Sequence, residues 1–539
     1  MENKQVNQAK QPLFKIRHLK KYFPVKKKTF SREQEYVHAN ENITLDIYQG
    51  ETLGLVGESG CGKSTLGRTI LQIYPATDGQ IIYYGASLGD VNPQYAREAL
   101  RDIPSLYPAY QKAMEDFLAL EKKAEDQAEK GSVDPALADD LLQRRRDMAN
   151  KYDVMLRLAG GLLVHDDLRK VSQLLLEELD EDAAYCKLKN RIKELEVQEQ
   201  LSPGKSSKRT AELADLVPQA TQLKQKVDAK KQELDDLRQS LHDKPGFAEL
   251  EDRLDRGIDL SKLTNEEIRP LRKQIQIIFQ DPYSSLDTRM TLGNIIGEGV
   301  IAHGMLNSNK SKEYNDYIQK VMGECGLAPY FIHRYPHQFS GGQRQRIGIA
   351  RALAVQPEFI VCDEAVSALD VSIQSQVINL LSDLKDQRGL TYLFITHDLS
   401  VVKYISDRIA VMYLGVVVEL ADSDELFANP LHPYTQALLQ AIPRTDVEQQ
   451  EISVLEGDIP SAVRPPTGCR FHTRCKYCMD VCSQFEPEFI RINDKHQLAC
   501  HLMDMPEDER KAYMAKKDAE DLARAAEADR LAHEAIQKI

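Results

Sequence analysis

Residues 57–65 read GESGCGKST and directly follow the apolar run TLGLV at residues 52–56. The stretch matches G-x-x-x-x-G-K-[ST] and lies between a strand-like run and a helix-like pattern, as such a loop requires. Its glycines let backbone N–H groups close around phosphate oxygens, and a helix N-terminus adds partial positive charge. The sequence therefore predicts a loop that binds nucleotide phosphates.

The side chains and backbone groups expected to bind ATP lie in this loop and in the first turn of the helix after it. They are Gly57, Gly60, Gly62, Lys63, Ser64 and Thr65. Lys63 would reach the β- and γ-phosphates, and the Ser64 hydroxyl would ligate Mg²⁺.

A second apolar run, FIVC at residues 359–362, ends in the carboxylates of Asp363 and Glu364. Asp363 is placed to hold Mg²⁺, directly or through water. Glu364 can polarise a water molecule for attack on the γ-phosphate. Downstream of a phosphate loop, this pair predicts ATP hydrolysis.

The sequence outside residues 86–257 has the texture of an α/β protein. Apolar strand-like runs alternate with helix-like patterns, which indicates a mostly parallel sheet with covered faces. The expected strands are 43–48, 52–56, 275–279, 359–362 and 392–395, and the expected helices are 66–73, 343–354 and 373–384.

Composition excludes several classes of protein. The net charge is −13, which argues against binding nucleic acid through a general basic surface. The longest apolar candidate for a membrane span, residues 409–418, is too short to cross a bilayer. The N-terminus is polar, without the apolar region of a secretory signal, and the nine cysteines are scattered, so we expect the reducing cytosol.

Residues 86–257 differ in composition from the rest of the chain. They hold 63 charged residues in 172, whereas the other 367 residues hold 90. They also lack strand-like runs, so we interpret them as a helical insertion. Without them, Tyr83-Tyr84-Gly85 would run on into Ile258 as an ordinary strand–loop–helix passage.

Apolar side chains within this insertion recur three and four residues apart from Leu213 to Leu241, and only Lys230 interrupts the series. This is the spacing of a coiled-coil seam. Residues 188–195 follow the same steps, and a turn cluster at 202–207 separates the two patterns, so we expect an antiparallel helical hairpin. Pro218 would mark the start of its second helix or a kink. The hairpin is either a solvated decoration or a docking surface for another protein.

Residues 339–343, FSGGQ, open an arginine-rich helix. Here the sequence resembles the ABC ATPases, whose signature is LSGGQ, with Phe339 in place of Leu. In that family the signature contacts the γ-phosphate held by the phosphate loop of a second subunit. The resemblance assigns this role to Ser340, Gly341, Gly342 and Gln343.

The other elements of that family appear in order. Gln280 resembles the Q-loop glutamine, which implies a role at Mg²⁺ and in catalysis. Asp370 ends a segment, SALD, that is similar to the D-loop, and His397 resembles the switch histidine. Phe23, beside Tyr22, resembles the aromatic residue that stacks on adenine.

Three longer stretches narrow the resemblance to the ATPase subunits of dipeptide and oligopeptide importers. They are QDPYSSLD at 280–287, HPYT at 432–435 and ISDRIAVMYLG at 405–415, the last of which resembles the F-type subunit. The resemblance implies two membrane permeases, a paralogous ATPase subunit (or a second copy), an extracytoplasmic peptide-binding protein as an indirect partner, and no nucleic acid. It also implies a peripheral position on the cytoplasmic face of the membrane.

Five of the nine cysteines fall within 32 residues. Cys469, Cys475, Cys482 and Cys500 have the spacing C-x5-C-x6-C-x17-C, with Cys478 between the second and third. The importer family carries an iron–sulfur cluster here, usually interpreted as [4Fe–4S] on those four cysteines, and four thiolates suit it. Zinc is one alternative, since Cys475, Cys478, Cys482 and Cys500 would also fill a tetrahedral site. Thiols that bind no metal are the other.

The expected fold is therefore α/β: a P-loop ABC-type ATPase domain with a helical subdomain, an inserted helical hairpin and a small C-terminal metal-binding module rich in cysteine. The expected parts are the ATPase core at 1–85 and 258–440, the insertion at 86–257, the C-terminal extension at 441–503 and a solvated helical tail at 504–539. The expected function is ATP hydrolysis that powers peptide import. The alternative is a non-transport ABC ATPase, either an SMC-like organiser of DNA or a translation-associated protein.

Overall fold

The computed structural model describes residues 11–26, 34–128, 134–201, 207–306, 308–441 and 457–536. The chain divides into two compact units. Unit 1 comprises Met1–Ile81, Lys273–Gly299 and Ile318–Ile539, and unit 2 comprises Ile82–Arg272 and Val300–Tyr317.

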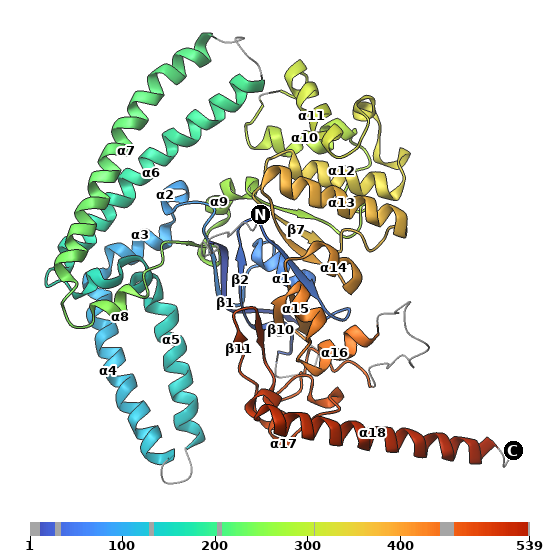
Figure 1. The fold of residues 1–539 in the computed structure, drawn as a ribbon. Coiled ribbons are helices and arrows are strands. Elements are labelled where there is room, and N and C mark those ends of the chain that lie inside the picture. The colour runs from blue at the N-terminus through green and yellow to red at the C-terminus, as the bar shows by residue number, and fades with distance from the viewer. Residues whose placement is uncertain are drawn as a thin grey trace, which may run out of the picture. The chain divides into compact units, whose positions relative to one another are not determined.

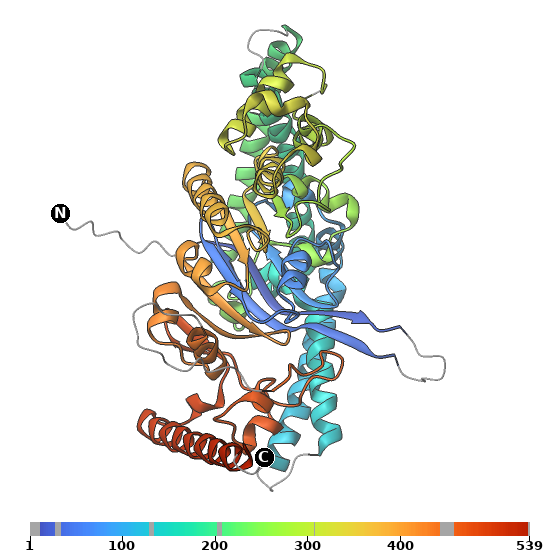
Figure 2. The ribbon, with the colours of Figure 1, turned by 90° about the vertical axis from the view of Figure 1, so that its right-hand side faces the viewer.

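The smaller sheet contains antiparallel strand pairs. Its long strands β1 (Pro12–Pro24) and β2 (Tyr36–Tyr48) pair from Pro12 with Tyr48 to Pro24 with Tyr36, and β4 (Asp78–Tyr83) lies on the other side of β1. The far ends of β1 and β2 project together from the rest of the sheet (Figure 2). The sequence predicted only the second half of β2, because lysine and arginine interrupt the apolar positions of β1.

The main sheet has eight strands in the order β11-β12-β10-β9-β3-β8-β7-β6. The five from β9 to β6 are parallel, and β10, β12 and β11 extend the sheet with antiparallel pairing. The strand bounds are β3 (Thr52–Val56), β6 (Ile275–Ile278), β7 (Phe359–Asp363), β8 (Thr391–Ile395), β9 (Arg408–Tyr413), β10 (Val416–Asp422), β11 (Ile490–Asn493) and β12 (His496–Leu498).

Every residue of β3, β7 and β8 is buried, as is usual for central parallel strands. Their carboxyl ends meet at one edge of the sheet, where the loops after them carry the predicted site. The apolar stretch 409–418 is not one element: it holds β9 and the start of β10, which turn back on each other at Leu414 and Gly415.

Further helices precede, separate or follow these strands along the chain. Their bounds are α1 (Lys63–Ile70), α10 (Leu292–Ala302), α11 (Lys312–Glu324), α12 (Gly341–Leu353), α13 (Val371–Arg388), α14 (Leu399–Ile405), α15 (Ser423–Ala428) and α16 (Pro433–Gln440). The three helices predicted here are present, with ends shifted by a few residues.

Unit 2 contains the predicted insertion at residues 86–257. Nearly all of the described part of this unit is helical. Its helices include α2 (Leu88–Val91), α3 (Gln94–Arg101), α4 (Ile103–Ala128), α5 (Pro135–Ala159), α6 (Leu168–Leu201), α7 (Ser207–Leu241), α8 (Phe247–Glu251) and α9 (Asn265–Ile268). Two pairs of long helices lie side by side, α4 with α5 and α6 with α7 (Figure 1). The sequence predicted only the second pair.

The predicted apolar stripe is the least exposed face of α7. Ala220, Val227, Leu234 and Leu241, seven residues apart, are its buried positions. The helix begins at Ser207, so Pro218 lies inside it and does not mark its start.

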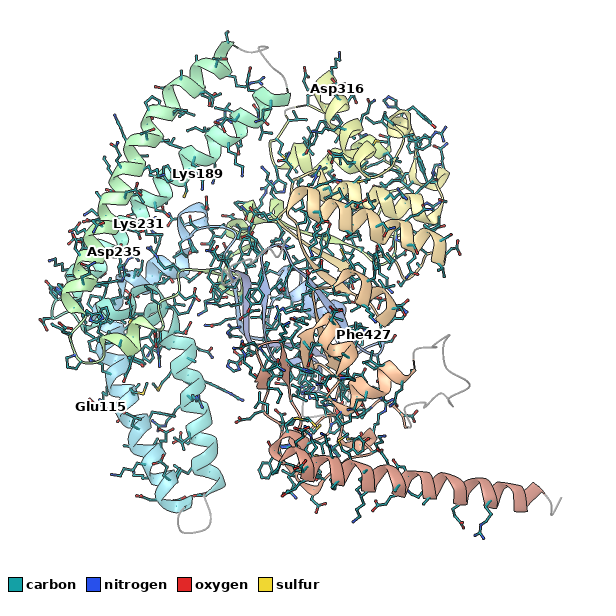
Figure 3. The ribbon with its side chains drawn as sticks, viewed as in Figure 1. Glu115, Lys189, Lys231, Asp235, Asp316 and Phe427 are labelled. Atoms are coloured by element: carbon teal, nitrogen blue, oxygen red, sulfur yellow. The ribbon has the colours of Figure 1, made fainter. Side chains whose placement is uncertain are left out.

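Ion pairs show the relative direction of α6 and α7. Glu177 pairs with Lys230 at 2.8 Å, Arg191 with Glu212 at 2.8 Å and Glu199 with Arg209 at 3.4 Å. Residue numbers rise along α6 as they fall along α7, so the two helices are antiparallel. Figure 3 labels Lys189 on α6 and Lys231 and Asp235 on α7.

The cysteine-rich segment belongs to unit 1 and joins the main sheet through β12, which pairs with β10. It contains α17 (Asp480–Gln484) and is followed by α18 (Glu507–Ile536). The tail was predicted to be solvated, but its first half contacts the cysteine segment: the Tyr513 hydroxyl donates to the Cys478 carbonyl at 3.1 Å, and Lys476 pairs with Asp518 at 2.7 Å.

Candidate nucleotide site

The phosphate loop connects β3 to α1. Gly57, Gly60 and Gly62 all have positive φ, and a Cβ on Gly57 would lie 2.1 Å from the Met412 carbonyl oxygen. Side chains cannot replace these glycines without distorting the loop. Lys63 is 4% exposed, and its ammonium group donates to the carbonyls of Gly57 and Glu58 at 2.8 and 2.9 Å. Ser64 and Thr65 are in the first turn of α1.

Two neighbouring residues hold this loop from outside. The buried Asn40 side chain donates to the Gly62 carbonyl at 3.1 Å, and the Tyr434 hydroxyl accepts from the Glu58 amide at 2.9 Å. Neither residue was predicted for the site, since nothing in a lone Asn or Tyr signals such a contact. The HPYT stretch that contains Tyr434 drew attention only through its resemblance.

Asp363 ends β7 and is fully buried. One carboxylate oxygen accepts from Arg68 of α1 at 2.9 Å, while the other has no hydrogen-bond partner among the described residues. An orphaned buried carboxylate oxygen is a suitable ligand for a hard cation, so the residues present fit Mg²⁺. No pattern in the sequence indicated Arg68.

Gln280, Glu364 and His397 come together. The Gln280 amide donates to a Glu364 carboxylate oxygen at 2.6 Å, and His397 Nδ1 lies 3.8 Å from the same oxygen. The three residues follow β6, β7 and β8, so the edge where parallel strands end brings them together. Glu364 has φ 48°, a strained backbone conformation of the kind that clusters at active sites.

The signature residues lie at the N-terminus of α12. Ser340 is the N-cap and accepts from the Gln343 amide at 3.4 Å, and the Gln343 side chain accepts from the Ser340 amide at 3.2 Å. Gly341 and Gly342 form the first turn, where a Cβ on Gly342 would lie 2.4 Å from Ile373 of α13. This helix N-terminus can present N–H groups to an anion.

The remaining predicted residues have simpler surroundings. Asp370 is the N-cap of α13, without a side-chain cap bond. Phe23 packs edge-on against Tyr74, with ring centroids 5.4 Å apart, and the Lys21 ammonium group lies 4.6 Å from its ring. Burial lowers the pKa of Lys21.

Two arginines of α12 anchor the segment after Gln280, and the sequence did not single them out. Arg344 stacks over the Tyr283 ring at 3.8 Å and donates to the Pro336 carbonyl at 2.8 Å. Arg351 donates to the Ser285 carbonyl at 2.6 Å. The signature helix is thus tied directly to the Q-loop.

The cysteines occupy a separate cluster. Burial raises the pKa of Cys469 to about 11 and that of Cys500 to about 12, and neighbouring thiols contribute to both shifts. The Cys469 amide donates to the Cys482 carbonyl at 2.8 Å. Across the described ranges, no three His, Cys, Asp or Glu side chains converge as ligands of one metal ion.

Two family models match the chain. The ABC transporter model matches residues 40–256 and 249–367, and the model for the C-terminal region of oligopeptide/dipeptide transporters matches residues 418–482. The chain is also 33% identical over 495 residues to AppF, an oligopeptide transport ATP-binding protein of Bacillus subtilis, covering 91% of this chain and 97% of that protein. The chain belongs to the oligopeptide and dipeptide ABC transporter family.

Other members match a shorter part of this ABC transporter ATPase at higher identity. YkfD of Bacillus subtilis, whose name refers to oligopeptide transport, is 50% identical over 250 residues, which cover 46% of this chain and 75% of that protein. A Brucella ovis protein named for peptide import is 51% identical over 245 residues, covering 45% and 76%. The chain is therefore an ATP-hydrolysing subunit of this family.

Proposed function

We propose that this ABC ATPase powers import of peptides through a membrane transporter. The observation that carries the proposal is the meeting of Gln280, Glu364 and His397 at the edge of the sheet that also bears the phosphate loop. The names of the relatives support peptides as the cargo.

Glu364 acts as general base and takes a proton from the attacking water. Gln280 and His397 contact its carboxylate and so fix the orientation of the base. Lys63 neutralises charge on the β- and γ-phosphates. Ser64, Gln280 and Asp363 would hold Mg²⁺, which when bound neutralises charge that develops on the transferred phosphoryl group.

A second ATPase subunit completes each site. Ser340, Gly341, Gly342 and Gln343 face the γ-phosphate of ATP in the partner's loop, and Asp370 lies beside that contact. The signature of the partner in turn faces the γ-phosphate of ATP bound to this chain. Phe23 stacks on the adenine of that ATP. The F-type resemblance favours a paralogue as partner over a second copy.

The proposed direct partners of the ATPase are two permeases, which contact it near the Q-loop. An extracytoplasmic peptide-binding protein is an indirect partner. No helix in the part of the chain that the structure describes is long and apolar enough to cross a membrane. We propose that the ATPase works at the cytoplasmic face of the membrane through its permeases. Copurification of two multi-spanning permeases from detergent extracts supports this assignment, and recovery of DNA or ribosomes in their place contradicts it.

The insertion at 86–257 is a separate domain within the ATPase core of 1–85 and 258–440. The match to YkfD covers 75% of that protein but only 46% of this chain, so more than half of this chain lies outside it. The ABC transporter model matches in two stretches, and these overlap at residues 249–256, beside the end of the insertion. The C-terminal extension at 441–503 and the tail at 504–539 follow the core.

Cys469, Cys475, Cys482 and Cys500 hold an iron–sulfur cluster, with zinc as the alternative metal. Four thiols in one small module are a suitable donor set for either. The Cys469 amide donates to the Cys482 carbonyl at 2.8 Å, so the backbone holds two of the four residues next to each other. The side chains would have to converge further to bind one cluster.

Replacing the proposed base tests the mechanism. Glu364→Gln should reduce ATP turnover by at least 100-fold while the variant still binds ATP, because the amide keeps the shape but cannot accept the proton. Turnover and binding of a fluorescent ATP analogue are measured together. Glu358→Gln, at the opposite end of β7, is the matched control. Ordinary turnover by Glu364→Gln would show that another group is the base.

Metal analysis tests the cysteine assignment. Cys469→Ser should lower the iron content of the anaerobically purified protein and its melting temperature, since a thiolate ligand is lost. Cys186→Ser, which lies in the insertion, should leave the iron content unchanged. Zinc in place of iron selects the alternative metal, and an unchanged metal content removes Cys469 from the ligand set.

A further inference from the structure

The cysteine segment makes a direct ion pair with the phosphate loop. Arg474, which precedes Cys475, donates to the Glu58 carboxylate from both terminal guanidinium nitrogens, at 2.7 and 3.1 Å. The Arg474 side chain is 5% exposed and that of Glu58 is 22% exposed. A bidentate, mostly buried pair of this kind has one preferred geometry, so it fixes the position of Glu58.

Packed aromatic rings surround this pair. Tyr413, Tyr434 and Phe471 contact one another, with ring centroids 4.8 to 5.3 Å apart, and the Arg474 guanidinium lies 5.8 Å from the Tyr413 ring. The Tyr434 hydroxyl accepts from the Glu58 amide at 2.9 Å. Both the backbone and the side chain of Glu58 are thus held by groups from outside the loop.

A second arginine of the same segment reaches the turn that supports the loop. Arg470 donates to the Leu414 carbonyl at 2.6 Å and lies 3.4 Å from Glu41. The next residue after Leu414, Gly415, donates its amide to the Cys61 carbonyl at 2.9 Å. The segment 469–475 therefore supports the loop at Glu58 directly and at Cys61 through one intermediate turn.

The charge of Glu58 is the physical reason why this matters. A carboxylate in a loop that binds phosphate groups repels them unless a cation neutralises it, and Arg474 is the cation in contact with it. We propose that Arg474 is a positioning residue for ATP binding, through which the cysteine segment sets the affinity of the phosphate loop for ATP. The proposal rests on nucleotide binding at this loop and adds a determinant of affinity to it.

A double-mutant cycle at the two charges tests the proposal. Arg474→Ala should weaken binding of Mg²⁺–ATP to the purified full chain on the order of tenfold, because Glu58 keeps an uncompensated charge. Glu58→Gln alone should tighten binding, because it removes that charge. Glu58→Gln in the Arg474→Ala background should restore most of the lost affinity. The KM for ATP should follow these changes while kcat moves less than twofold between wild type and Arg474→Ala.

A merely structural role gives different results. If Arg474 only stabilises the module, Glu58→Gln weakens binding and does not rescue Arg474→Ala, which overturns the proposal. Unchanged binding in Arg474→Ala also overturns it. Should Arg474→Ala fail to fold, Arg474→Lys takes its place: it loses the bidentate geometry but keeps the charge that offsets Glu58. ATP affinity should therefore fall by no more than about threefold, and a larger loss again counts against the proposal.

The matched control is Arg464→Ala. Arg464 lies in the same C-terminal segment but away from the phosphate loop, where it forms an ion pair with Glu35 at 2.5 Å. Arg464→Ala should therefore leave ATP binding unchanged. Wild-type protein is titrated with Mg²⁺–ATP in parallel. Failure of the wild type to bind would contradict the nucleotide site itself, whereas normal wild-type binding with no response to Arg474 contradicts only the inference.

Discussion

The carboxylate of Asp363 shows how one buried residue prepares the site for a cation. It is fully buried, Arg68 satisfies one of its oxygens, and no described residue bonds to the other. Removing the partner of a buried charge is strongly destabilising, so Arg68 is the cation that offsets Asp363 before any metal binds. The free oxygen is then available to Mg²⁺.

Arg68→Ala should therefore destabilise the protein. The expected loss is roughly 2 to 4 kcal/mol in the free energy of unfolding, because removing one partner leaves a buried carboxylate without its cation and Arg68 is itself partly exposed. Saturating Mg²⁺–ATP should reduce the loss, since the cation compensates the same charge. Denaturant unfolding with and without Mg²⁺–ATP measures both effects.

Arg68→Lys is the control for charge, and it should recover part of the stability because the cation remains. An equal loss of stability in Arg68→Ala with and without Mg²⁺–ATP would argue that Asp363 does not meet the metal.

Residue patterns identified the catalytic carboxylates but not their partners. Asp363 and Glu364 follow an apolar run, which is a local signal, and Gln280 and His397 were found through resemblance. Arg68 lies 295 residues from Asp363, and Arg474 lies 416 residues from Glu58. Such contacts depend on the fold of distant segments, and no spacing along the sequence reports them.

At the scale of one element, α16 begins with a histidine in an unusual state. His432 is 1% exposed and caps the helix, accepting from the Tyr434 amide at 3.1 Å. Burial lowers the pKa of His432 to about 4, although Glu419 acts in the opposite direction. The folded protein therefore keeps this imidazole neutral, as the cap requires.

This cap predicts a pH dependence of stability. The unfolded chain binds a proton at His432 near pH 6.5 and the folded chain only near pH 4, so the free energy of unfolding should fall as the pH drops between these values, by up to about 3 kcal/mol. His432→Asn keeps a cap acceptor but cannot titrate, so this loss should disappear. Unfolding of both proteins from pH 7.5 to 4.5 provides the comparison.

His496 must be separated from this effect, since it titrates with the opposite sign. Burial lowers its pKa, but the hydrogen bond and charge of Glu419 outweigh burial and raise it overall. Its contribution is present below its unfolded pKa and is lost as the pH rises through its folded pKa. The difference between wild type and His432→Asn cancels the His496 contribution, and a pH-independent difference would contradict a neutral His432.

Elements with a simple period were predicted and the others were missed. The strand Thr52–Val56 was predicted with its observed bounds because it is apolar throughout. The predicted stripe of α7 lies on the buried face because that helix has one apolar face. The pair α4 and α5 was missed because residues 111–127 of α4 have no buried side chain, so no apolar period marks them. The high content of charged residues was the signal that the sequence offered for those two helices.

At the scale of the whole molecule, the ends of the insertion meet in a single hydrogen-bonded ladder. Tyr83, at the end of β4, pairs with Ile258, the first residue of β5 (Ile258–Asp259), and Ile82 pairs with Asp259. The strands are antiparallel, so a turn of two to four residues could join them directly. An insertion with adjacent ends can be added to a domain without separating the strands it interrupts.

Replacing residues 84–257 with a short Asn-Gly turn should therefore leave a folded ATPase. The strand register at Tyr83 and Ile258 is the register of a hairpin, and the phosphate loop, Asp363, Glu364 and the signature all lie outside the deleted segment. We expect ATP binding within about threefold of the full chain and a single unfolding transition. Nucleotide titration and thermal unfolding test this, with a turn in which Asn-Gly is replaced by Pro-Pro as the control that cannot close the hairpin. If the deletion variant aggregates or loses ATP binding although its hairpin turn is favourable, the insertion contributes to the core of the ATPase. If ATP binding survives but cells that carry the variant no longer grow on peptides, the insertion acts in the assembled transporter.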